Sequence, residues 1–204
     1  MLQYLPYINS AGPVPAKTRT KRMKQDKSLV QIALYAALIA ALGLIPPVPF
    51  ITGIPITAQT LGVMLAGVML GPWRGALAMA LFIFVVALGA PLLAGGRGGL
   101  GVFVGPTAGF AIGFPFAAFA TGYMALWLKR LPVFPAALLA SVFGGIVVLY
   151  LFGITGFKLI SGRDWLDALL VMAVFIPGDL VKAVIAAGVA QAVVKGLPGA
   201  MLTR

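Results

Sequence analysis

A long apolar run without a charged residue occupies positions 132–157, and several further runs along the chain are almost as long. Such runs match the hydrocarbon core of a bilayer, which a helix of about 20 apolar residues crosses. They are continuous, whereas the strands of a membrane β-barrel alternate apolar and polar residues over about ten positions. Only 9% of the residues are charged, against about 25% in soluble domains. We therefore predict an all-α integral membrane protein.

The apolar segments predict six transmembrane helices, over residues 29–45, 57–71, 74–93, 104–128, 132–157 and 177–195. Residues 164–175 are too short to cross a bilayer. They form either a short interfacial or re-entrant helix before the last span, or part of one long helix that bends at Pro177. The predicted division is a basic N-terminal tail over 1–28, a membrane domain over 29–196 and a C-terminal tail over 197–204.

The basic residues predict the orientation in the membrane. Six of the fifteen Lys and Arg residues lie in residues 17–27, just before the first span. Such segments stay on the cytoplasmic side and can contact anionic membrane lipid. With six spans both termini are cytoplasmic, and eleven of the fifteen basic residues lie inside. We expect a multi-pass protein without a cleaved signal peptide, and we attribute the net charge of +11 to topology rather than to nucleic-acid binding.

The composition argues against several kinds of chemistry. The chain has no Cys and no His, and its only acidic residues are Asp26, Asp164, Asp167 and Asp179. We therefore expect no metal site, no catalytic residues and no cofactor. The dipeptide Gly-Lys of nucleotide-binding phosphate loops is absent, so we expect no ATPase activity of its own.

Asp179 and Lys182 stand together in an apolar segment, in the stretch "PGDLVK". A charged residue in a membrane span is costly and is by default functional. The alternative is local: Pro177 starts a helix, Asp179 suits its positive end, and Lys182 pairs with it at i+3. A carboxylate beside an ammonium group suits a polar ligand, because the two accept and donate hydrogen bonds respectively.

Two further segments place polar groups on the outer side of the membrane, where the predicted topology also places the start of the last span. Glycines surround Arg97 in residues 95–101, and such a loop can approach a ligand closely and expose backbone N–H groups. The alternative is a flexible outer turn with a solvated Arg. Thr57, Gln59 and Thr60 bring hydrogen-bonding groups to the outer end of the second span; helix capping by Thr57 is the alternative there.

Small residues recur four positions apart, which predicts close helix packing. Gly67 with Gly71 and Gly109 with Gly113 follow this spacing. The first span has a denser alanine stripe, which predicts a flat face for docking a partner protein. Its members are Ala33, Ala37 and Ala41.

Three stretches in order carry a resemblance to a known family. They are "PITAQTLGVMLAGVMLGPWRGALA", "GAPLLAGGRGGLGVFVGPTAGFAIGF" and "PGDLVKA". Together they resemble the BioY family, the biotin-binding S components of energy-coupling factor (ECF) transporters, from about residue 29 to 196. The resemblance implies an S-component-like bundle in the bacterial inner membrane that captures biotin from the outer face. It also implies a transmembrane coupling subunit, docked on the alanine stripe, and two cytoplasmic ATPase subunits.

The resemblance assigns the last-span pair, Asp179 and Lys182, to biotin binding, and the glycine loop to closure over the site. The chemistry of biotin is compatible with this, because its ureido ring has two N–H donors and a carbonyl, while its ring and chain are otherwise apolar. The carboxylate of biotin needs a donor, for which Arg97 is one candidate and Thr side chains and backbone N–H groups are others. The full predicted set is Thr57, Gln59, Gly96, Arg97, Gly98, Tyr150, Asp179 and Lys182.

Three alternatives to biotin capture remain on the sequence alone. The first is an S component for a different small vitamin. The second is a lipid-modifying membrane enzyme, a class that commonly needs several acids converging on a metal. The third is a proton-driven transporter with Asp179 as the proton carrier, although the chain has no second copy of "PGDLVK".

Overall fold

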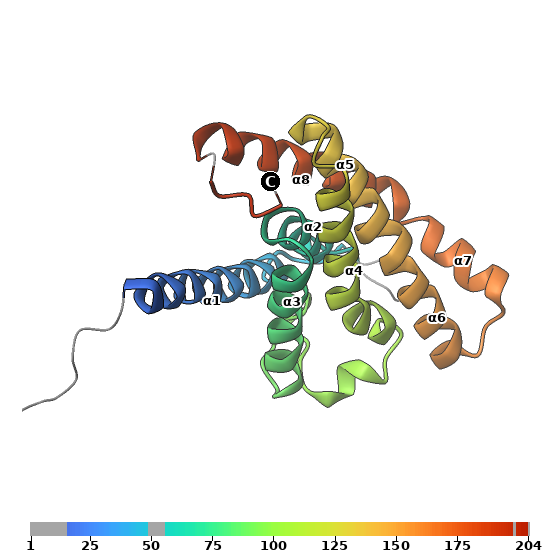
Figure 1. Ribbon diagram of the computed structural model, residues 1–204. Coiled ribbons are helices and arrows are strands. Elements are labelled where there is room, and N and C mark those ends of the chain that lie inside the picture. The colour runs from blue at the N-terminus through green and yellow to red at the C-terminus, as the bar shows by residue number, and fades with distance from the viewer. Residues whose placement is uncertain (1–15, 49–55, 198, 204) are drawn as a thin grey trace, which may run out of the picture.

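The computed structural model describes residues 16–48, 56–197 and 199–203, and its elements are helices (Figure 1). A 3₁₀ turn, Leu100–Phe103, precedes the fourth helix, and a π-helical segment, Phe143–Val148, joins the fifth to the sixth. The α-helices are α1 (Ala16–Gly43), α2 (Gln59–Leu70), α3 (Pro72–Ala87), α4 (Ala108–Trp127), α5 (Val133–Val142), α6 (Leu149–Ser161), α7 (Trp165–Ala173) and α8 (Ile176–Gly196).

Four helical stretches within the described residues are long and apolar enough to cross a membrane: Asp26–Gly43, Ala108–Trp127, Val133–Ser161 and Ile176–Gly196. The predicted all-helical class is confirmed, whereas the count of six spans is not, because α2 has 12 residues and α3 has 16. A glycine explains the early end of α2. Gly71 takes a φ of 81°, a conformation that favours glycine, and Pro72 then starts α3.

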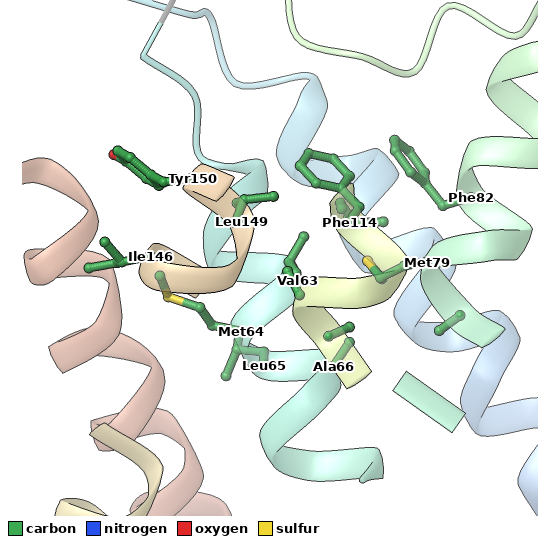
Figure 2. Packing of buried hydrophobic residues seen from close by; sticks show 14 of the residues in the cluster. Val63, Met64, Leu65, Ala66, Met79, Phe82, Phe114, Ile146, Leu149 and Tyr150 are labelled. Atoms are coloured by element: carbon green, nitrogen blue, oxygen red, sulfur yellow. The ribbon is translucent and has the colours of Figure 1, made fainter. Parts of the chain in front are cut away.

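The short helix α2 lies at the centre of the bundle (Figure 1), in contact with α1, α3, α4, α5 and α8. Of its residues, only Leu61 is not buried. Protein therefore surrounds α2, so that its length need not match the thickness of the lipid. Figure 2 shows its side chains packed among those of the surrounding helices: Val63, Met64, Leu65 and Ala66 lie among Met79, Phe82, Phe114, Ile146 and Leu149.

The segment before the last span is a separate short helix, α7, and α8 then begins at Ile176. Of the two predicted interpretations, the short extra helix is therefore confirmed.

The boundaries of two other helices differ from the prediction. Helix α1 begins at Ala16, so the basic segment 17–27 continues the first helix instead of preceding it. Helix α3 ends at Ala87 rather than near 93, because Gly89, with a φ of 109°, and Pro91 cannot extend it.

Glycines allow the helices to approach closely, as the four-residue spacing predicted. A side chain at Gly67 would meet the backbone of Ala118 on α4. At Gly109 it would meet the carbonyl of Phe152 and the backbone of Gly156, both on α6. Close backbone contact through small residues is how membrane helices associate without a hydrophobic driving force between them.

Residues 200–203 fold back onto the end of α2 rather than extending away from the bundle. The backbone N–H of Leu202 donates to the carbonyl of Met69 at 2.7 Å, and the Thr203 hydroxyl donates to the carbonyl of Val68 at 2.8 Å. The last carbonyls of a helix lack partners within the helix. This short strap therefore satisfies two of them.

We expect Thr203→Val to lower the stability of the bundle by about 1–3 kcal/mol, since it leaves a buried carbonyl without its hydroxyl donor. Thr203 is 1% exposed, so water cannot replace the lost bond without a rearrangement. Thermal unfolding in detergent measures the effect. Thr203→Ser, which keeps the hydroxyl, should lose clearly less; equal losses would mean that the methyl packing and not the bond matters.

Candidate ligand-binding site

A cavity opens between α2, α4, α6 and α8, beneath the loop that follows α3. The space between its walls, about 640 Å³, includes open solvent. Most of its wall surface is apolar, although seven of the fourteen lining residues are polar or charged. The lining residues are Ile56, Thr57, Gln59, Thr60, Leu93, Arg97, Thr107, Phe110, Ala111, Phe114, Tyr150, Phe175, Asp179 and Lys182.

The carboxylate of Asp179 is the centre of a polar cluster in this cavity. Lys182 Nζ donates to its Oδ1 at 2.7 Å, and the Thr60 hydroxyl donates to the same oxygen at 2.9 Å. The Tyr150 hydroxyl donates to Oδ2 at 2.6 Å. Lys182 also donates to Thr60 Oγ1 at 3.0 Å. The cluster thus joins α2, α6 and α8 through side chains alone.

Local structure explains why these groups converge. Pro177 stands at the start of α8 and places Asp179 in the first helical turn. The side chain does not cap its own helix; both carboxylate oxygens are bonded to side chains as described above. Asp179 is 4% exposed and the Lys182 side chain 16%. The buried acid therefore has a paired charge, as a carboxylate in a dry site requires.

Arg97 also lines the cavity, from the loop between α3 and α4. Its Nε donates to the carbonyl of Ala94 at 3.2 Å, and its Nη1 donates to Thr107 Oγ1 at 3.1 Å. Gly96 and Gly98 do not line the main cavity. They line an adjacent surface hollow that shares Arg97 and Thr107 with it, so Arg97 stands between the hollow and the cavity.

Thr57 and Gln59 both line the cavity, at the start of α2. The residue before the helix is Ala58, and no side chain caps it, so the alternative that Thr57 caps α2 is wrong. The Gln59 amide faces backbone groups. Its Nε2 donates to the carbonyls of Ile39 at 3.3 Å and Leu92 at 3.0 Å, and its Oε1 accepts from the N–H of Ala94 at 3.0 Å.

Comparison with known proteins decides the family. The sequence profile of the BioY family matches residues 16–199. The chain belongs to the BioY family. It is 50% identical to "Biotin transporter BioY" of Rhodobacter capsulatus over 189 residues, which cover 88% of this chain and 99% of the relative. The protein of the same name from Rhizobium etli is 48% identical, over 84% of this chain and 95% of the relative.

A solved structure shares the fold of this BioY-family chain. It is the crystal structure of the S-component for biotin from an ECF-type ABC transporter, 31% identical in sequence, with a TM-score of 0.79. The match covers 84% of this chain and 93% of the solved one. The resemblance noted in the three sequence stretches is therefore confirmed, and so is the S-component-like arrangement of helices.

The BioY-family cavity contains residues that the predicted set lacked. Thr60 was one of three polar residues noted near the start of α2, but its bond to both Asp179 and Lys182 depends on the register between α2 and α8. Nothing in the sequence marked Thr107 as a cavity residue. The aromatic walls, Phe110, Phe114 and Phe175, could not be distinguished by sequence from aromatic residues that face lipid.

The alanine stripe of α1 faces outward. Ala33, Ala37 and Ala41 are all exposed, while Ala36 and Ile39 on the opposite side are buried in the core. The stripe is thus not buried against the other described helices. Within the same residues, 16–48, 56–197 and 199–203, no three His, Cys, Asp or Glu side chains gather as a metal site would require.

Proposed function

We propose that this BioY-family protein captures biotin at the outer face of the membrane, as the ligand-binding component of an ECF-type transporter. The observation that carries the proposal is the cavity itself. It combines a buried acid–base cluster, aromatic walls and a guanidinium group at its rim, in a chain that is 50% identical to a protein named as a biotin transporter.

The two polar regions match the two polar ends of biotin. The ureido ring needs acceptors for two N–H groups and a donor for one carbonyl. Asp179 and Thr60 supply the former, and Lys182 supplies the latter. The carboxylate of biotin needs a cationic donor, and Arg97, which lines the same cavity, supplies it. The apolar ring and chain of the ligand fit the aromatic walls between them.

The topology we propose has six membrane helices and both termini in the cytoplasm. Helices α2 and α3 complete the six, since α2 is enclosed by protein and needs no lipid-matching length. The cavity lies at the end of the bundle where α2 and α8 begin, because Gln59 and Asp179 line it, and α1 ends at Gly43 beside Gln59. With the basic start of α1 inside, that end faces outward, which supports capture from the outer side.

Delivery of biotin inward needs energy from partner subunits. The chain contains no Gly-Lys dipeptide, which supports an energy source on other subunits. We propose a transmembrane coupling subunit that docks on the alanine stripe of α1 (Ala33, Ala37 and Ala41), with two cytoplasmic ATPase subunits beneath it. Small residues on an exposed helix face allow another helix to approach closely.

Uptake of radiolabelled biotin into cells that lack their own biotin transporter tests the function. Cells that express this chain together with an ECF coupling subunit and its ATPases should accumulate biotin, and excess unlabelled biotin should block the accumulation. Omission of the ATPases should abolish accumulation while leaving biotin bound at the cell surface. No accumulation by correctly inserted protein with all subunits present would refute the proposal.

We expect Ala37→Trp to reduce uptake roughly tenfold or more, equivalent to about 1.4 kcal/mol of lost docking free energy, because the large ring prevents close helix contact. Biotin binding by the purified variant should stay within about twofold of the original. Ile185→Trp is the matched control, since Ile185 is also exposed, on α8. If Ala37→Trp weakened binding itself, the stripe would be part of the bundle's own packing.

A further inference from the structure

We propose that Gln59 is a positioning residue that holds the loop over the cavity and thereby places Arg97, rather than a residue that contacts the ligand. The inference concerns the site of the proposed function and rests on it for the identity of the ligand. It changes the role predicted for Gln59 from the sequence, where its amide was assigned to biotin.

The hydrogen-bonding capacity of the Gln59 side chain is directed at backbone, not at the cavity. A primary amide has two N–H donors and one carbonyl acceptor. Both donors find carbonyls, of Ile39 on α1 and Leu92 in the loop, and the acceptor receives the N–H of Ala94. Gln59 is 2% exposed. A ligand that needs an N–H from Gln59 would have to displace one of these buried bonds.

The hydrogen bonds of Gln59 are connected to Arg97 through one residue, Ala94. The N–H of Ala94 donates to Gln59 Oε1, and the carbonyl of Ala94 accepts from Arg97 Nε. The loop closes on itself here, since Leu93 and Arg97 exchange backbone hydrogen bonds of 3.0 and 3.2 Å. Gly95 and Gly96, with φ values of 80° and 70°, make this tight turn possible. Fixing Ala94 therefore fixes the base of the Arg97 side chain.

Gly43, at the end of α1, lets the loop come close enough for this arrangement. A side-chain atom at Gly43 would stand 2.8 Å from Gln59 Nε2 and would collide with the carbonyl of Leu92. The end of α1, the start of α2 and the loop thus meet around one amide group. Any side chain at Gly43 would therefore disturb the contact between Gln59 and the carbonyl of Leu92.

The absence of cysteine in this chain provides a direct test of loop position without ligand. Ala94 is 1% exposed, so the single thiol of Ala94→Cys should react slowly with a maleimide in detergent. Adding Gln59→Met, which has a similar shape but no amide, should accelerate labelling about ten- to a hundredfold, as expected for loss of several buried hydrogen bonds. Gln191→Met, the same change in α8, should leave the labelling rate unchanged.

The second measurement is the rate of biotin release from protein without the cysteine. For Gln59→Met we expect dissociation to become about ten- to a hundredfold faster, with an association rate that does not fall and with full stoichiometry. A merely structural role would instead lower the fraction of binding-competent protein and leave the release rate unchanged. Gly43→Ala should reproduce both effects, and it carries the test if Gln59→Met fails to fold.

Failure of the positioning role and failure of the proposed function give different results. Unchanged labelling in both variants overturns the positioning role, whatever the ligand is. Faster labelling with unchanged biotin release also overturns it, because the loop would then move without affecting the site. If the unaltered protein binds no biotin at all, the proposed function fails, while the labelling rates still decide whether Gln59 holds the loop.

Discussion

Asp179→Asn should weaken biotin binding about a hundredfold, a loss of about 2–3 kcal/mol. The substitution keeps the shape of the side chain but removes the charge that Lys182 faces at 2.7 Å. The ammonium group then lies in a largely apolar cavity without its counter-ion. The amide nitrogen also replaces one of two oxygens that now accept from Thr60, Lys182 and Tyr150.

Titration of biotin into the purified variant measures the effect, together with a melting curve that confirms folding. Asp167→Asn is the matched control, because Asp167 also lies in the first turn of a helix, α7, but is exposed and outside the cavity. It should bind as the unaltered protein does. Unchanged affinity in Asp179→Asn would make that residue a helix-start acid with no part in ligand binding.

Gly109→Leu should prevent the bundle from forming or destabilise it by about 3 kcal/mol or more, at the upper end for an overpacked position. At this crossing of α4 and α6 the new side chain meets backbone atoms, the carbonyl of Phe152 and Cα of Gly156. Backbone cannot rotate aside as a neighbouring side chain can, so the two helices would have to separate. Phe110 and Tyr150, which line the cavity from these helices, would separate with them.

Yield of monodisperse protein and thermal unfolding in detergent measure this effect. Gly188→Leu is the control, since Gly188 also lies within a membrane helix but has open space around it. That variant should purify and unfold as the unaltered protein does. A Gly109→Leu protein of ordinary yield and stability would mean that α4 and α6 do not meet at this point.

The charged part of the site could be predicted from sequence because charges are rare in this chain. With four acidic residues in all, an Asp followed by a Lys inside an apolar segment is conspicuous. The sequence did not distinguish the aromatic residues of the cavity wall, since phenylalanine also commonly faces lipid. The role of Gln59 was also beyond prediction, because its partners are backbone groups of a loop and of α1 that only the folded chain brings near.

The membrane helices show a related limit of prediction from sequence. Hydropathy predicted the position of each helix, since apolar runs and the Gly and Pro residues between them are local features. It could not predict that α2 would be short, because a helix enclosed by protein and a helix facing lipid have the same apolar composition. The strap over residues 200–203 depends in the same way on distant carbonyls at the end of α2.

Calorimetric titration into the detergent-purified chain, of biotin and of desthiobiotin, thiamine and riboflavin for comparison, tests whether this protein binds biotin selectively. We predict saturable binding of biotin at one site per chain, with a dissociation constant on the order of nanomolar, about −12 kcal/mol, and no binding of thiamine or riboflavin. Binding of another vitamin in place of biotin, or no binding by folded protein, would contradict the account.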